Sequence, residues 1–173
     1  AAFFSEDDHY PILIEQNRNP ELEMNVQEVM AELESLGTEQ TRKTYLRHGA
    51  PAKLFGVKIG DMKKVVRKIK IDQALAEALY TTGNVDAQYF AGLIADPDEF
   101  TPELLNQWAK SAVYTGISLP IVAALAAESG HGFECGLEWI ESDEDKISAT
   151  GWAAFNHAMS ITPDEKLNLP EIS

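Results

Sequence analysis

The sequence lacks most of the residues from which disulfide frameworks, zinc sites and membrane spans are built. It holds one cysteine, Cys135, and four scattered histidines, which form no internal disulfide and no recognisable metal site. No apolar run approaches the roughly 18 residues of a membrane span, so no membrane partner is predicted. The opening stretch "AAFFSEDDHYPILIEQ" is acidic where a secretory signal is basic. A reducing cytoplasm is therefore the predicted location.

Catalytic motifs are missing as well. The sequence contains no GxSxG, HExxH or CxxC pattern. The stretch "GVKIGDMKK" lacks the GxxxxGK[ST] spacing of a phosphate loop and follows no predicted strand. The glycines of "GHGFECG" have the wrong spacing for a dinucleotide fingerprint. Residue chemistry alone thus identifies no catalytic pair, and no metal or organic cofactor is predicted.

Basic residues are few but concentrated. There are 14 Lys and Arg against 28 Asp and Glu, a net charge of −14. Ten of the basic residues lie between Arg42 and Lys70, with one acid, Asp61, among them, so this window is net +9 while the other 144 residues are net −23. The acidic total disfavours a general nucleic-acid or membrane binder. A local basic face can still bind an anionic partner, because salt screens charges more than about 8–10 Å away.

The hydrophobic pattern predicts an all-α protein of one domain. Apolar residues recur at helical spacing, strand-like alternation is not found, and 45% hydrophobic content is normal for a globular chain. Gly37 and Pro97 are predicted to end helices, and Thr101-Pro102 to start one. Short antiparallel helices in succession favour an α-solenoid or an irregular bundle. The predicted helices cover 26–36, 38–48, 60–70, 73–80, 86–96, 101–111, 117–129, 133–143 and 146–160.

The ends of the chain differ from its middle. Residues 1–23 precede Met24, which resembles a natural start, so this segment is predicted to be a leader or extension. Residues 24–173 are predicted to form the helical repeat domain. Thr162-Pro163-Asp164 starts a further helix, and the chain then stops in "KLNLPEIS", which suggests that the helical array is interrupted there.

Two interpretations of the basic helix stay open. Lys63, Arg67 and Lys70 form one stripe of the helical wheel and Lys64 and Lys68 the next, opposite an apolar face. Such a face can be merely solvated, or paired with acidic helices nearby. It can also bind phosphates, which supplies affinity and salt dependence without sequence specificity.

The aromatic residues are similarly ambiguous. Trp108, Trp139 and Trp152 are most simply core residues of a helical repeat, while Tyr114, near a helix–helix turn, could line a groove. Asp143 is predicted to cap the helix that follows it.

Three stretches carry a resemblance to a known family. "LFGVKIGDMKKVVRKI", "LAEALYTTGNVDAQYFAGLIADP" and "GLEWIESDEDKISATGWAAF" resemble the DNA alkylation repair family, AlkD-like glycosylases built from HEAT-like helical repeats, over roughly residues 26–160. The resemblance implies a curved stack of antiparallel helix pairs with a positively charged concave groove for duplex DNA. It also implies excision of N3- and N7-alkylated purines, a hydrolytic reaction that needs water and no cofactor.

The family's catalytic residues do not carry over. Active members place an aspartate in the groove near two tryptophans. Counting from Trp108 puts Ala112 at that position, and aligning on Lys110-Ser111 puts Ile117 there. The family arginine falls at Ala149. The chain therefore resembles a divergent member, and its catalytic residues are unknown.

Two functional hypotheses follow. The first is a DNA alkylation repair-family protein that binds duplex or damaged DNA, with 3- or 7-alkylpurine glycosylase activity only if another carboxylate substitutes. The second is a non-catalytic α-solenoid scaffold that binds an acidic protein partner. The oligomeric state stays open. The residues predicted to contact DNA are Lys58, Lys63, Lys64, Arg67, Lys68, Lys70, Trp108, Lys110 and Tyr114.

Overall fold

A computed structural model describes residues 24–167, and within this range the chain forms helices and no strands. The all-α prediction is confirmed for these residues. The predicted leader 1–23 and residues 168–173 lie outside the described range. The helices are α1 (Val26–Leu36), α2 (Glu39–Arg47), α3 (Ile59–Ile69), α4 (Gln73–Tyr80), α5 (Val85–Ile94), α6 (Pro102–Ser111), α7 (Thr115–Ile117), α8 (Ala123–Glu128), α9 (Gly132–Ile140) and α10 (Asp145–Ile161), with single turns η2 (Pro97–Glu99), η3 (Ser118–Val122) and η4 (Asp164–Lys166).

Side-chain caps mark the starts of several helices. Asn25 and Glu28 form a reciprocal capping box at the start of α1. Thr38 and Thr101 accept backbone N–H bonds at the starts of α2 and α6, as their sequence positions predict. The prediction for Asp143 is wrong. The residue before α10 is Glu144, whose side chain makes no cap bond, and the Glu144 N–H donates instead to the Ser142 hydroxyl.

A proline interrupts the helix predicted over 117–129. The observed helical stretch runs from Thr115 to Glu128, but its middle, Ser118–Val122, is a π-helical turn that contains Pro120. Proline has no N–H to donate to the preceding turn, so the wider turn accommodates it without ending the helix.

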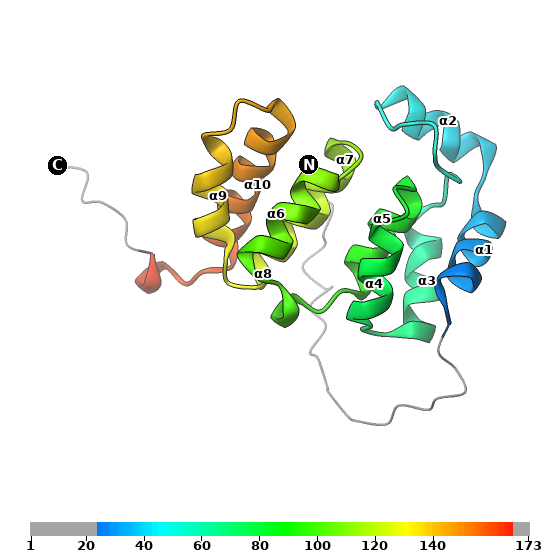
Figure 1. Cartoon of the computed structure of the whole chain (residues 1–173), viewed down its shortest axis with the longest axis horizontal. Coiled ribbons are helices and arrows are strands. Elements are labelled where there is room, and N and C mark those ends of the chain that lie inside the picture. The colour runs from blue at the N-terminus through cyan, green and yellow to red at the C-terminus, as the bar shows by residue number, and fades with distance from the viewer. Residues whose placement is uncertain (1–23, 168–173) are drawn as a thin grey trace.

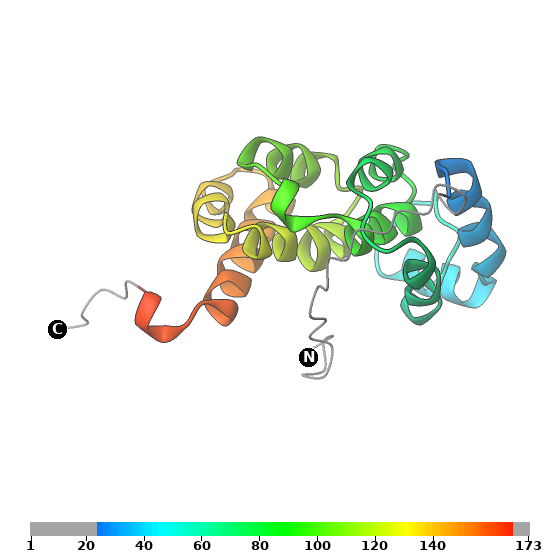
Figure 2. The same cartoon turned by 90° about the horizontal axis from the view of Figure 1, so that it is seen from below.

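The helices form a curved row of two layers. Figure 1 shows α1 at one end of the row and α10 at the other. Helix α3 packs beside α5, α5 beside η3, and α8 beside α10, so these elements make one layer. The other layer holds α4, α6 and α9, and Figure 2 shows the α3–α5–α8–α10 layer on the inner side of the curve. Helix α3 therefore lies at one end of the inner layer.

Helices α9 and α10 approach each other closely. Gly136 and Gly151 face each other across this pair. A Cβ on Gly151 would lie 2.6 Å from the Ile140 nitrogen and 2.8 Å from the Gly136 oxygen. Only glycine allows the two backbones to approach so closely.

No helix within residues 24–167 is long and apolar enough to cross a membrane.

Candidate nucleic-acid interface

Helix α3 presents its basic residues to solvent because its other face is anchored in the core. Met62 and Val65 are each 1% exposed, and Val66 and Ile69 pack against the same core. The opposite face carries only polar and charged side chains, which is the arrangement that the helical wheel predicts. The exposed basic residues on or next to α3 are Lys58, Lys63, Lys64, Arg67, Lys68 and Lys70.

Acidic residues neutralise part of this surface. The Lys64 ammonium donates to Asp61 at 2.7 Å, and this bond holds the pKa of the Asp61 carboxyl below its usual range. The Lys68 ammonium donates to Glu32 of α1, also at 2.7 Å. Both lysines remain mostly exposed, with 72% and 60% of their side chains accessible. Exposed pairs of this kind contribute little stability, so a phosphate can displace the acid at small cost.

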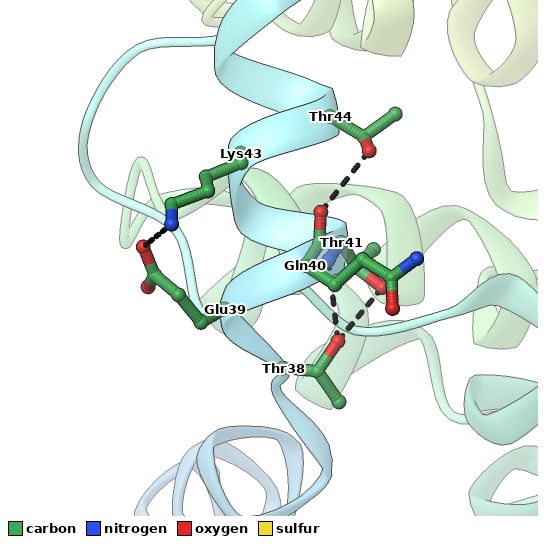
Figure 3. Close-up of polar contacts among 6 residues, drawn as sticks. All are labelled: Thr38, Glu39, Gln40, Thr41, Lys43 and Thr44. Atoms are coloured by element: carbon green, nitrogen blue, oxygen red, sulfur yellow. Dashed lines mark hydrogen bonds and ion pairs between the residues drawn. The ribbon is translucent and has the colours of Figure 1, made fainter.

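The first turn of α2 lies just before the basic window, which begins at Arg42. Figure 3 shows Thr38 closing the first turn of α2 through bonds with the Thr41 nitrogen and hydroxyl. Lys43 lies 3.7 Å from Glu39 on the same helix. The Thr44 hydroxyl is also satisfied, since it donates to the Gln40 carbonyl. Side chains at this turn thus bond mainly to one another.

The loop that precedes α3 is held by a buried carboxylate. Asp86 of α5 is fully buried and accepts backbone N–H bonds from Phe55 at 2.6 Å, Gly56 at 3.0 Å and Val57 at 2.8 Å. Gly56 has φ +84°, and a Cβ there would lie 2.5 Å from the Arg42 nitrogen. The glycine of "LFGV" is therefore required by both conformation and space. Asp86 fixes the direction in which the chain enters the basic helix.

A cavity opens beside the start of α3. It has a volume of about 90 Å³ and lies where the first residues of α3, α5 and α7 converge. Three tyrosines contribute to its wall, one each from α2, α5 and the turn before α7. The lining residues are Tyr45, Ile59, Met62, Val85, Asp86, Tyr89, Tyr114, Gly116 and Ile117.

The tyrosines face the buried carboxylate and one another. The Tyr45 hydroxyl donates to the Val57 carbonyl at 2.8 Å. Burial raises the pKa of Tyr45 to about 12, with a further contribution from the negative charge of Asp86. Burial likewise raises the pKa of Tyr89 and of Tyr114, and Asp86 adds to the shift at Tyr114. The phenols are therefore neutral hydrogen-bonding groups at physiological pH.

Trp108 does not lie on an open surface. Its side chain is 3% exposed and stacks on Tyr80 with ring centroids 3.7 Å apart, while Phe100 packs against its edge. The Tyr80 hydroxyl donates to the Trp108 carbonyl at 2.9 Å. The prediction that Trp108 lines a groove is wrong for this structure, because its ring is enclosed by these aromatic contacts. Trp139 is also buried, whereas Trp152 is 61% exposed.

Lys110 lies apart from the basic helix α3. It is exposed at the end of α6, where it lines a cleft of about 130 Å³ between α6, α9 and the start of α10. The Trp139 indole N–H donates to Asn106 in this cleft. The Lys146 ammonium donates to the carbonyls of Lys110 and Ala112 and closes the end of α6. The structure thus separates Lys110 from the α3 basic residues.

Residues 29–162 match a protein-family model that is described as DNA alkylation repair enzyme. The chain belongs to the DNA alkylation repair enzyme family. The family resemblance expected from the sequence is confirmed, and so is the HEAT-like character of the fold.

Two curated proteins are similar to this chain in sequence. The chain is 30% identical over 138 residues to the uncharacterized protein Lmo0209 of Listeria monocytogenes, covering 77% of this chain and 62% of that protein. It is 29% identical over the same length and coverage to the uncharacterized protein Lin0241 of Listeria innocua. The chain thus spans less than two thirds of the length of these relatives.

One solved structure resembles the fold closely. It is 38% identical with a TM-score of 0.79, over 83% of this chain and 61% of the other. It is described as a new family of proteins related to the HEAT-like repeat DNA glycosylases, with affinity for branched DNA structures.

The positions that would carry the catalytic aspartate are apolar and enclosed. Ala112 is 3% exposed, and Ile117 is 1% exposed in the wall of the tyrosine cavity. Asp86 supplies a carboxylate to that wall, but its two oxygens already accept three backbone N–H bonds. Among the described residues no group of three or more His, Cys, Asp or Glu side chains could hold a metal ion.

Sequence reasoning missed most of the cavity. It selected Tyr114 but not Tyr45 of α2 or Tyr89 and Asp86 of α5. The available signal was the acidic residue in "NVDAQYF" one position after the start of an apolar helix. Its partner loop, however, lies about thirty residues earlier, and no local pattern joins the two.

Proposed function

We propose that this protein binds DNA, with a preference for branched or distorted forms, through the exposed basic residues of α3 and the adjoining loop. The observation that carries the proposal is the exposed basic face of α3, in a chain whose other residues are strongly acidic. The family and the solved relative with affinity for branched DNA structures support it. Lys58, Lys63, Lys64, Arg67, Lys68 and Lys70 would hold phosphates.

Excision of alkylated purines is not part of this proposal. Removing the main electrostatic group from an enzyme of this kind costs roughly 3–4 kcal/mol of transition-state stabilisation. Ala112 and Ile117 cannot supply that charge, and the bonds of Asp86 occupy most of its acceptor sites. We therefore expect binding without base release. The cytoplasm remains the proposed location.

The first test is a matched pair of charge reversals. Arg67→Glu lies on the proposed surface, and Lys166→Glu changes the net charge equally at an exposed position in η4, at the other end of the array. Fluorescence anisotropy with a linear duplex and a three-way junction would measure affinity between about 50 mM and 200 mM salt. Arg67→Glu should weaken binding to both DNAs and lower the salt slope by about one, because one phosphate contact is lost. Equal effects of the two variants would contradict the proposed surface.

A second candidate function uses the same charges. An acidic segment of a partner protein could dock on α3, as Glu32 already does on Lys68 within this chain. Competition separates the two candidates. Displacement of a bound acidic peptide by plain duplex or junction DNA favours DNA, whereas an acidic peptide that binds when DNA does not would favour the scaffold. Assaying base release from methylated duplex DNA in parallel would contradict the non-catalytic proposal if turnover exceeded the spontaneous rate.

A further inference from the structure

We infer that the tyrosine cavity beside α3 receives an unpaired nucleobase at a DNA branch point, and so gives the basic surface its preference for branched DNA. The inference rests on the proposed DNA-binding function and adds a specificity site to it.

The first observation is the chemistry of the wall. Tyr45, Tyr89 and Tyr114 combine aromatic faces with polar edges, and Ile59 and Met62 make the rest of the surface apolar. Bases stack on aromatic side chains whatever their identity, because every base has a π-face. A cavity of about 90 Å³ suits a small planar group better than a drug-sized ligand.

The second observation is the state of the hydroxyl groups. The Tyr45 hydroxyl donates to the Val57 carbonyl, and this bond holds the ring in the cavity wall. Within residues 24–167 the Tyr89 and Tyr114 hydroxyls have no hydrogen-bond partner, although both side chains are half-buried. Half-buried tyrosines usually direct the hydroxyl to a partner or to water. These two groups are therefore available to the polar edge of a base.

The third observation is position. Ile59 and Met62 line the cavity from α3, and their sequence neighbours Lys58 and Lys63 are exposed basic residues. A DNA backbone that contacts Lys58 would lie near the first turn of α3, where Ile59 lines the cavity. Paired bases are stacked inside the duplex and cannot enter, whereas a base at a branch point is already unstacked and enters without the cost of unpairing.

Gly116 lines the cavity and lets the Tyr114 ring lie close to the backbone. A Cβ at this position would lie 2.3 Å from that ring. A side chain at 116 would push the Tyr114 ring away from its present position. Gly116→Ala therefore disturbs the site without removing an aromatic group.

The experiment compares the affinities of three DNAs for the protein, residues 1–173. One is a three-way junction with two unpaired adenines at the branch, the second has abasic sites at those two positions, and the third is a linear duplex of equal length. We expect the adenine junction to bind about tenfold more tightly than the abasic junction, the effect of stacking one base. Tyr114→Leu and Tyr89→Leu should lower the affinity for the adenine junction to that for the abasic junction, so that the ratio is abolished. Tyr114→Phe should retain it, since the ring is kept.

The control is an aromatic residue elsewhere. Trp152→Leu removes an exposed ring from α10, far along the array, and should keep the tenfold ratio. Equal binding of the adenine and abasic junctions, or a ratio that survives Tyr114→Leu and Gly116→Ala, would overturn the inference while the proposed DNA binding stands. Failure to bind all three DNAs would overturn the proposed function itself. Thermal unfolding of each variant identifies any loss that comes from misfolding.

Discussion

At the scale of single residues, Asp86 organises the region around α3. One carboxylate accepts three consecutive backbone N–H groups that would otherwise be buried without partners, and each such bond to a charged acceptor contributes about 1.5–3 kcal/mol. Asp86, the carboxylate that could best have replaced the missing catalytic aspartate, therefore has a structural role. Its position explains why the "LFGV" loop and the helix "DAQYF", about thirty residues apart, form a single unit.

The tyrosines make a prediction about alkaline pH. Tyr45 has a folded pKa of about 12 against about 10 in an unfolded chain, and burial raises the pKa of Tyr80, Tyr89 and Tyr114 as well. Below pH 10 both states hold neutral phenols and the contribution to stability is complete. Between about pH 10 and pH 12 the unfolded chain ionises first, so the free energy of unfolding should fall as pH rises.

Phenolate absorbance and denaturant unfolding, followed over the same pH range, check this prediction. Folded protein should show delayed ionisation for most of its tyrosines. Tyr45→Phe should reduce the fall in stability between pH 10 and pH 12, at the cost of about 1 kcal/mol at neutral pH for the lost bond to Val57. Ionisation of all tyrosines near pH 10 in the folded state would contradict the burial of these rings.

At the scale of elements, α3 is a basic helix whose positive charge is partly neutralised by acidic residues. The Lys68–Glu32 contact joins α3 to α1 and places a negative charge on the proposed phosphate surface. Glu32→Gln should therefore raise affinity for duplex DNA severalfold at low salt and leave thermal stability nearly unchanged, because an exposed pair is worth at most about 1 kcal/mol. Anisotropy measures the gain. Glu138→Gln, at an exposed position on α9, is the matched control and should have little effect.

The contact between α9 and α10 gives the second prediction at this scale. Gly151→Ala puts a methyl group 2.6 Å from the Ile140 nitrogen, where backbone rather than a flexible side chain must move. We expect a loss of about 1–3 kcal/mol in the free energy of unfolding, the usual cost of overpacking. Gly60→Ala in α3 meets no atom within 4 Å and should cost little. Similar losses for the two variants would show that close packing is not the reason for glycine at 151.

Sequence patterns located these elements well because their signals are local. Capping residues at Asn25, Thr38 and Thr101 determine where helices begin, and each acts within three residues of its own position. The prediction for Asp143 failed because the residue that precedes α10 is Glu144, one position later, and its side chain makes no cap bond.

At the scale of the whole molecule, charge is divided between one cationic region and an acidic remainder. A net charge of −14 repels DNA at most orientations, so only approaches that bring phosphates to α3 are favourable. The acidic remainder thus orients a DNA partner while the basic residues hold it. The same division implies strong salt dependence, because binding energy would come from few phosphate contacts set against a repelling background.

The sequence by itself determined the helical class, most helix boundaries, the family and the existence of an exposed basic face on α3. These follow from periodicity, capping and local composition, which act over a few residues. Only the tertiary structure decided that Trp108 is enclosed by Tyr80 and Phe100, that Lys110 lies apart from α3, and that three tyrosines surround one cavity. Those outcomes depend on contacts between helices far apart in the chain, and an aromatic residue at helical spacing has the same local pattern whether its ring packs inward or lines an opening.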